Sequence, residues 1–156
     1  MKIYLPFLAA LLFFSCQTAR TIDKNKTAEE SEQTEQTMKS ELIGKWTLDY
    51  MSPVAGISFD KLFGIQMPYL TFVDGEKVAG NNGCNNIAGE YTATDKRISF
   101  DTEKFRSTRM FCENFDETAF TGMLKTINGY SVINNGQKLI LLTGDIVSMT
   151  FVRTQE

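Results

Sequence analysis

The sequence has no histidine among its 156 residues, and only three cysteines, three prolines and one tryptophan. Without histidine, neither a Ser-His-Asp nor a Cys-His constellation can be assembled, and the scattered carboxylates do not make a credible catalytic zinc site. Acidic and basic side chains nearly balance at a net charge of −3, with no block of one sign. Nothing in this balance indicates a nucleic-acid or anionic-lipid surface. We therefore expect a protein that is not an enzyme, has no cofactor or metal, and binds no nucleic acid.

Long apolar runs are also absent, except near the N terminus, where residues 3–14 are apolar and follow a lysine. That run is too short to span a bilayer stably, which predicts a signal peptide over residues 1–15. It ends at Ser15-Cys16, and a small residue directly before a cysteine resembles the lipobox of bacterial lipoproteins, in which that cysteine is acylated. The two phenylalanines before Ser15 depart from the usual pattern. An ordinary cleaved signal peptide and an uncleaved helix are the alternatives.

Residues 16–40 are predicted to be a lipidated cysteine followed by a flexible tether. Several acyl chains such as palmitate on Cys16 would anchor the protein stably, since each buried methylene contributes about 0.8 kcal/mol. The stretch 17–40 has no aromatic residue and is mostly polar, so it cannot bury enough apolar surface to fold. The implied partner is a membrane. We expect a lipid anchor in the bacterial cell envelope, at the outer membrane facing the periplasm, because no acidic cluster follows Cys16.

Residues 41–156 have the length of a single domain with one core, and short β-prone runs recur there between turn dipeptides. The clearest hairpin signals are Asp74-Gly75, Asp95-Lys96 and Asn135-Gly136. The predicted strands cover 46–50, 70–72, 76–80, 90–94, 97–100, 130–133, 138–142 and 146–152. About eight strands are too many for a flat sheet of this size. The expected fold is mainly β (α+β): a strongly curled, barrel-like antiparallel sheet with one short α-helix.

Side-chain alternation predicts which face of two strands is buried. In the first strand Trp46, Leu48 and Tyr50 alternate on one face. In the last, Val147, Met149 and Phe151 alternate against Ser148 and Thr150.

One segment has helical spacing, with apolar residues at positions 120, 123, 124 and 127. Asn114 is expected to cap this helix, with Glu117 three residues later as in a capping box. Gly129 follows where a left-handed C-terminal cap is expected. The segment 52–68 contains proline, glycine and several apolar residues, which favours an irregular loop or short helix. It is either a structural lid over one end of the sheet or a mobile flap over an apolar cavity.

Cys84 and Cys112 are the only cysteines outside the leader. In an oxidising compartment two cysteines in a small domain are more often bridged than free, which would stabilise the fold by roughly 3 to 4 kcal/mol. A redox pair is the alternative, although Cys-x-x-Cys spacing and a tuning histidine are missing. Free buried thiols are the third interpretation.

Glycine and asparagine surround Cys84 in the stretch 80–91. A phosphate loop is rejected because no helix with Lys and Ser or Thr follows Gly83. Gly80, Gly83 and Gly89 are better explained by backbone bends and close approach in a curved sheet. The asparagines at 81, 82, 85 and 86 are expected to bond local backbone groups, and a polar ligand site built from them is the alternative.

Charged residues cluster around Cys112. Arg109 is expected to hold a carboxylate within the fold, or one on a partner. Glu113, Asp116 and Glu117 form a small acidic group that suits the first turn of a helix, whose N-terminus favours negative charge. An acid and base pair for catalysis is the weaker interpretation.

These stretches together resemble the paired signature of the META domain family (HslJ-like) of small bacterial envelope proteins. The resemblance covers most of residues 44–152, including Leu70-Thr71-Phe72, residues 117–124 and the closing hairpin at 139–142. The residues that carry the motifs are Trp46, Gly80, Gly83, Cys84, Asn85, Gly89, Tyr91, Thr108, Arg109, Met110 and Cys112. The family implies a compact, mostly antiparallel, barrel-like domain, a cysteine pair typical of its envelope members, and an association with heat-shock and antibiotic tolerance. It implies no agreed biochemical activity.

Three functional hypotheses follow. The first is a non-catalytic envelope lipoprotein with a META domain at residues 41–156, acting in stress tolerance through contacts with other envelope components. The alternative is a carrier or sensor of a hydrophobic ligand held in the mouth of the curled sheet. A hydrolytic enzyme ranks third.

Overall fold

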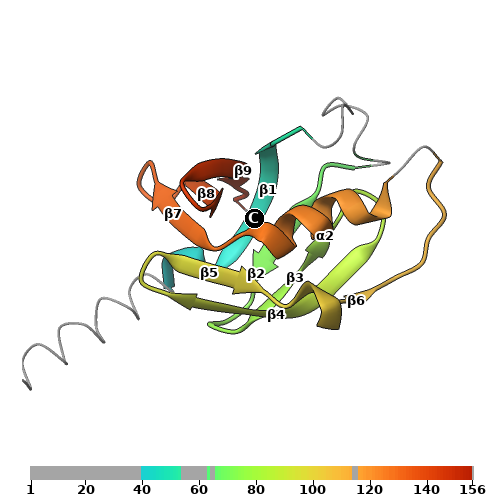
Figure 1. Ribbon diagram of the computed structural model, residues 1–156, viewed down its shortest axis with the longest axis horizontal. Helices are drawn as coiled ribbons and strands as arrows, with labels where there is room; N and C mark the ends of the chain where they lie inside the picture. The colour runs from blue at the N-terminus through green and yellow to red at the C-terminus, as the bar shows by residue number, and fades with distance from the viewer. Residues whose placement is uncertain (1–39, 54–62, 64–65, 114–115, 156) are drawn as a thin grey trace, which may run out of the picture.

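The computed structural model describes residues 40–53, 63, 66–113 and 116–155. Eight antiparallel strands in the order β5-β4-β3-β2-β1-β9-β8-β7 form one sheet that curls into a nearly closed barrel, and a short strand β6 pairs with β4 (Figure 1). The strands are β1 (Gly44–Met51), β2 (Tyr69–Phe72), β3 (Lys77–Asn81), β4 (Asn86–Thr94), β5 (Arg97–Phe100), β6 (Arg106–Ser107), β7 (Gly129–Ile133), β8 (Lys138–Thr143) and β9 (Ile146–Arg153). A 3₁₀ turn, η2 (Thr102–Lys104), and a helix, α2 (Glu117–Thr126), lie between β5 and β7, and residues 40–42 before β1 are also helical. The barrel-like, mainly β fold expected from the sequence is confirmed.

The two ends of the strand order approach each other and nearly close the barrel. The backbone N–H of Tyr130 in β7 donates to the carbonyl of Lys96, in the turn before β5, over 2.9 Å. Helix α2 lies between the β7–β9 part of the sheet and the β2–β6 part (Figure 1). Its side chains therefore enter the space that the curled sheet leaves open.

The interior of the sheet is filled by apolar side chains. Phe120 and Leu124 of α2 are fully buried, and the Phe120 ring meets the Phe151 ring edge-on with centroids 6.4 Å apart. The largest fully buried side chains from the strands are Trp46, Met51, Leu70, Phe72, Tyr91, Ile98, Leu139 and Phe151. Burial of these side chains supplies the main driving force for the fold. The apolar stripe predicted for the helix is confirmed as core.

The ends of the helix differ from the prediction. The N-cap is Asp116, not Asn114, and its carboxylate accepts from the backbone N–H of Thr118 over 2.9 Å. At the other end Ile127 is extended with a φ of −69°, and Gly129 begins β7. Gly129 is therefore not a left-handed cap, because the chain turns directly into a strand whose pairing with β8 sets its conformation. Asn114 itself lies outside the described residues.

Replacing the N-cap residue in Asp116→Ala is expected to lower the free energy of unfolding by about 1 kcal/mol. Hydrogen bonds from the side chain and backbone of Thr118 lower the pKa of Asp116. Because the pKa of Asp116 is lower in the folded than in the unfolded state, its carboxylate stabilises the fold fully above the unfolded-state pKa, about pH 4. This stabilisation is lost as the pH falls through the folded-state pKa. Urea unfolding at pH 7 and at pH 2.5 to 3 should thus show a wild-type advantage at neutral pH that shrinks in acid. Asp145→Ala, which removes an exposed turn carboxylate, is the control, and an equal loss there would contradict the capping explanation.

Two β-bulges alter the predicted faces of the paired strands β1 and β9. Leu48 pairs with Phe151 and Tyr50 with Thr150, so Asp49 is an extra residue. As a result Tyr50 is 43% exposed rather than buried beside Trp46. The carboxylate of Asp49 instead accepts from the hydroxyl of Thr150 over 3.1 Å.

The second bulge adds Ser148, because Leu141 pairs with Met149 and Leu142 with Val147. Val147 is consequently exposed, whereas Ser148 and Thr150 are buried, which is opposite to the sequence prediction for these three residues. A bulge places two residues opposite one, so the alternation of faces shifts on one side of it.

Further features of the described chain bear on the predictions. Strand β4 begins at Asn86 rather than at residue 90, and β6 was not expected. The proposed lid at 52–68 lies largely outside the described residues, although Phe63 packs against the core. The predicted leader and tether at 1–39 also lie outside them. Within the described part of the chain, no helix has the length and apolar character needed to cross a membrane.

Candidate functional site

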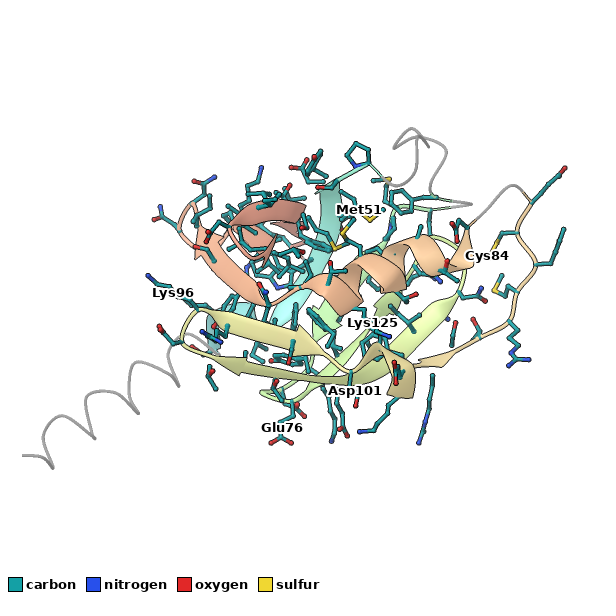
Figure 2. All side chains as sticks on the ribbon, in the orientation of Figure 1. Met51, Glu76, Cys84, Lys96, Asp101 and Lys125 are labelled. Carbon is teal, nitrogen blue, oxygen red and sulfur yellow. A yellow bond between two sulfur atoms is a disulfide. The ribbon has the colours of Figure 1, made fainter. Side chains whose placement is uncertain are left out.

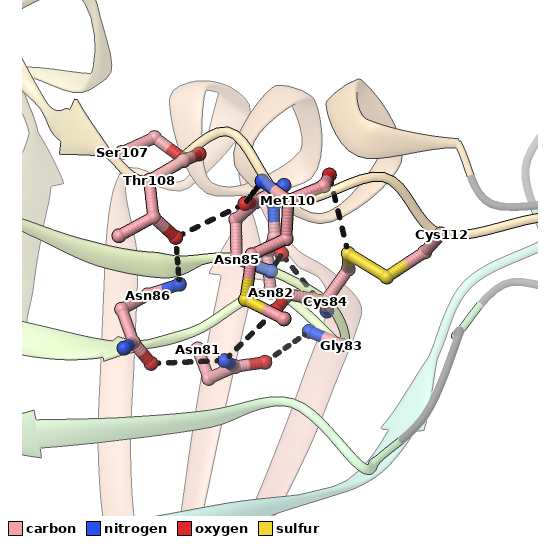
Figure 3. The surroundings of a disulfide bond; sticks show 10 residues. All are labelled: Asn81, Asn82, Gly83, Cys84, Asn85, Asn86, Ser107, Thr108, Met110 and Cys112. Carbon is pink, nitrogen blue, oxygen red and sulfur yellow. Dashed lines mark hydrogen bonds between the residues drawn. A yellow bond between two sulfur atoms is a disulfide. The ribbon is translucent and has the colours of Figure 1, made fainter.

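The loop between β3 and β4 is built by asparagine side chains that bond its own backbone (Figure 3). The side-chain amide oxygen of Asn82 accepts from the backbone N–H groups of Cys84 and Asn85, over 3.1 and 2.7 Å. The side-chain amide oxygen of Asn81 accepts from the backbone N–H of Gly83 over 2.7 Å. Asn81, Asn82 and Asn85 are each 1% exposed. The side chains of Asn81 and Asn82 thus take the structural role predicted for them, because their amide oxygens accept from nearby backbone N–H groups. The amide oxygen of Asn86 accepts instead from the side chain of Asn81.

Asn85 links this loop to a segment 23 to 25 residues further along the chain. Its amide oxygen accepts from the hydroxyl of Thr108 over 3.0 Å and from the N–H of Met110 over 2.7 Å. The hydroxyl of Thr108 in turn accepts from the N–H of Asn86 over 3.0 Å. One hydrogen-bonded contact therefore joins three of the motif residues, Asn85, Thr108 and Met110.

A disulfide joins the same two segments. Cys84 and Cys112 are bonded, with their Cα atoms 6.2 Å apart, which confirms the expected bridge. Cys84 is 1% exposed, and its Sγ lies 3.7 Å from the carbonyl oxygen of Met110. Chain segment 108–112 is consequently held against the asparagine loop both by the covalent bond and by the Asn85 hydrogen bonds.

Glycine is required at two of the motif positions. Gly83 has a φ of +109°, in the left-handed region that side-chain-bearing residues rarely adopt. At Gly80 a Cβ atom would collide with the backbone carbonyl of Tyr69 in the neighbouring strand. The expectation of bends and close approach is confirmed at both positions.

The contact at Asn85 makes a specific prediction for stability. Asn85→Ala removes the acceptor for Thr108 and Met110 and should lower the free energy of unfolding of the oxidised protein by about 2 kcal/mol, since two part-buried hydrogen bonds are lost. The Met110 amide should also exchange its hydrogen faster. The matched control is Asn86→Ala, since Asn86 is exposed and contributes one amide oxygen, bonded to Asn81 over 3.1 Å. Equal losses in the two variants, or unchanged exchange at Met110, would contradict the role given to Asn85.

Trp46, a third motif residue, lies in the core away from the disulfide and is fully buried. Its indole N–H donates to the carbonyl of Leu42 over 2.7 Å, and the guanidinium of Arg153 stacks over its ring at 4.1 Å. Arg153 also donates to the carbonyls of Ile43 and Gly136, over 2.8 and 2.6 Å. Together these contacts tie the first described residues to β9. Arg153 was missed by the sequence reasoning, because a single arginine at a strand end carries no local signal.

Tyr91 and Gly89 lie in β4. The Tyr91 hydroxyl donates to the carbonyl of Asp74 over 2.7 Å, and its ring meets the Phe72 ring edge-on at 4.8 Å. Burial, with a smaller effect of the Asp74 charge, raises the pKa of Tyr91 to about 12. Gly89 faces the ring of Phe105, which occupies the space of a side chain at that position. Both are therefore structural residues of the barrel wall.

Three consecutive residues of the second motif region face solvent. Arg109 is exposed, Met110 is 53% exposed and Phe111 is 92% exposed. Among the residues that the structure describes, Arg109 makes no ion pair, so the expected carboxylate within the fold is not found there. Within the acidic group, Asp116 caps α2 and Glu113 is exposed.

The other charged clusters lie on the outer surface (Figure 2). A groove of about 380 Å³ on the outer face is bordered by Lys77, Glu90, Lys104 and Arg106. Lys104 pairs with Asp101 and Lys125 with Glu103, each over 2.7 Å, and these contacts lower the pKa of Asp101 and raise that of both lysines. In residues 40–53, 63, 66–113 and 116–155, no three His, Cys, Asp or Glu side chains are placed to hold a metal ion. These exposed pairs are surface electrostatics, which contribute little to stability.

Fold and site together define a small, nearly closed antiparallel barrel with one helix packed into its opening and a disulfide-held exposed loop. Residues 40–156 match the model of the META domain, and the chain belongs to the META domain family. Its structure is similar to an NMR structure of a protein from Burkholderia xenovorans, with a TM-score of 0.55 and 24% sequence identity over 77% of this chain and 88% of the other. That likeness supports the fold alone. No curated protein sequence gives a significant match.

Proposed function

We propose that the protein is a non-catalytic lipoprotein of the bacterial cell envelope whose META domain acts by contact with other envelope components, in tolerance of envelope stress. The observation that carries the contact function is the exposed segment at 109–111, held in place by the disulfide and by Asn85. A protein that works by contact needs such a surface, and the buried apolar side chains of the described strands and of α2 pack against one another in one core. The stress role rests on what the family resemblance implies.

The lipid anchor and the compartment rest on the Ser15-Cys16 sequence. Growing the native bacterium with an alkynyl fatty acid should label the wild-type chain, and Cys16→Ala should lose both the label and the membrane fraction. Equal labelling of the two proteins would contradict the anchor. Separation of inner and outer membranes would then locate it, with an outer-membrane position expected.

The contact function is separated from ligand carriage by native mass spectrometry of the protein taken from its own envelope. A ligand-free mass is expected. A stoichiometric bound lipid would instead favour a carrier of hydrophobic molecules. Hydrolytic activity of the purified protein towards envelope substrates, retained after repeated purification, would contradict the non-catalytic assignment.

A further inference from the structure

The exposed residues Arg109, Met110 and Phe111 form a ridge between β6 and α2, called here the 109–111 ridge. In Figure 1 residues 108–113, which follow β6, project from the body of the domain on the side away from the start of β1. Phe111 is 92% exposed, and Met110 next to it is 53% exposed. Arginine, methionine and aromatic residues are the types enriched in the buried centres of protein interfaces. Three adjacent exposed residues of these types indicate an interaction surface more strongly than a single exposed apolar residue does.

The ridge is held in a fixed place although it protrudes. On its N-terminal side Thr108 bonds Asn85 and Asn86, and within it the Met110 N–H bonds Asn85 over 2.7 Å. On its C-terminal side the adjacent Cys112 is bonded to Cys84. A loop already ordered before binding loses little conformational entropy on association. This favours recognition of a shaped protein surface over insertion into a fluid bilayer, which needs no ordered loop.

The charge of the ridge limits the kind of partner further. Arg109 has no ion pair among the described residues, whereas Lys104 pairs with Asp101 and Lys125 with Glu103. A carboxylate on a partner would satisfy its planar guanidinium with two parallel hydrogen bonds. A lone arginine beside the exposed Glu113, on a chain with a net charge of −3, does not suit an anionic membrane.

We propose that the ridge inserts the Phe111 side chain into an apolar pocket on a partner protein of the envelope, with a carboxylate at the pocket rim pairing with Arg109. This inference rests on the proposed contact function and assigns it a surface and a class of partner. Phe111 supplies the desolvated anchor, Met110 extends the apolar contact, and Arg109 gives orientation and specificity.

The test places the photoreactive residue p-benzoylphenylalanine at position 111 of the full chain in the native bacterium. Control positions are Val73, directly after β2, and Ile146, the first residue of β9, which are 58% and 70% exposed. A protein adduct specific to position 111 is expected, and mass spectrometry identifies the partner. The purified partner is then titrated with the wild type and three variants.

Phe111→Ala and Arg109→Glu should each weaken binding at least about tenfold. Arg106→Glu makes the same charge change at a residue bordering the outer groove, and should alter affinity less than about twofold. Replacing the partner's rim carboxylate by arginine should restore binding to Arg109→Glu. Since these side chains are exposed, unchanged thermal unfolding verifies that the variants are folded.

Several outcomes would overturn the inference. Adducts to lipid at position 111 would make the ridge a membrane contact. Adducts at Val73 or Ile146 without one at 111 would leave the contact function standing and remove the ridge from it. Equal affinity of Phe111→Ala and wild type for the identified partner would also remove it. If no protein adduct forms at position 111, at the control positions or at a wider set of exposed sites, that result would count against the contact function itself.

Discussion

Reduction of the Cys84–Cys112 disulfide is expected to lower the free energy of unfolding by about 3.5 kcal/mol. The two cysteines are separated by 28 residues, so the bond closes a long loop that includes β4, β5 and β6. Closing a loop of this length removes many conformations from the unfolded chain. Neither cysteine belongs to the packed apolar core cluster, so the reduced domain should still fold. The main local change should be faster hydrogen exchange in segment 108–113.

Urea unfolding of the oxidised and reduced protein measures this difference directly. The double variant Cys84→Ala/Cys112→Ala should match the reduced wild type to within about 1 kcal/mol, because Cys84 is buried and its replacement leaves only a small void. The reductant should have no effect on the stability of the double variant. Equal stability of oxidised and reduced wild type would mean that the loop closure contributes nothing.

Trp46→Ala should destabilise the domain by about 3 to 5 kcal/mol, the range found when a buried tryptophan is truncated. Trp46 is fully buried, and the truncation also removes the hydrogen bond to the Leu42 carbonyl and the ring on which Arg153 stacks. Trp46→Phe keeps an aromatic ring and should cost about 1 to 2 kcal/mol, since mainly the indole N–H and part of the volume are lost.

Circular dichroism should follow unfolding in these variants, because Trp46 is the only tryptophan and its fluorescence disappears with it. Arg153→Lys is an informative companion: it keeps the charge but loses the planar fork that reaches Ile43 and Gly136. A loss below about 1.5 kcal/mol for Trp46→Ala would contradict a structural role at the centre of the core.

Much of the fold could be predicted because its signals are local. Asp95 at the β4–β5 turn and Asn134, Asn135 and Gly136 at the β7–β8 turn adopt positive φ, as their turn chemistry predicts. The apolar stripe of α2 has helical spacing and is buried. The helix start was misplaced because several polar residues precede it, and choosing among capping residues depends on which one the chain path presents to the first turn.

The candidate site was predictable in its members but not in its geometry. Cys84, Cys112, Asn85 and Thr108 were all identified by pattern, yet only the folded chain brings Thr108 within 3.0 Å of Asn85. The exposure of Phe111 could not be predicted from the sequence, because an isolated phenylalanine next to a cysteine is equally consistent with a buried position in the core.

By itself, the sequence determined the family, the number and order along the chain of most strands, the helix, and the two cysteines that could form a disulfide. These depend on turn residues, spacing and composition, which act within a few residues along the chain. Only the tertiary structure decided the bulges at Asp49 and Ser148, the stacking of Arg153 on Trp46, and the ridge that ends in Phe111. Each of these depends on contacts between segments far apart in sequence, or on the lack of a covering segment, and local propensity carries no information about either.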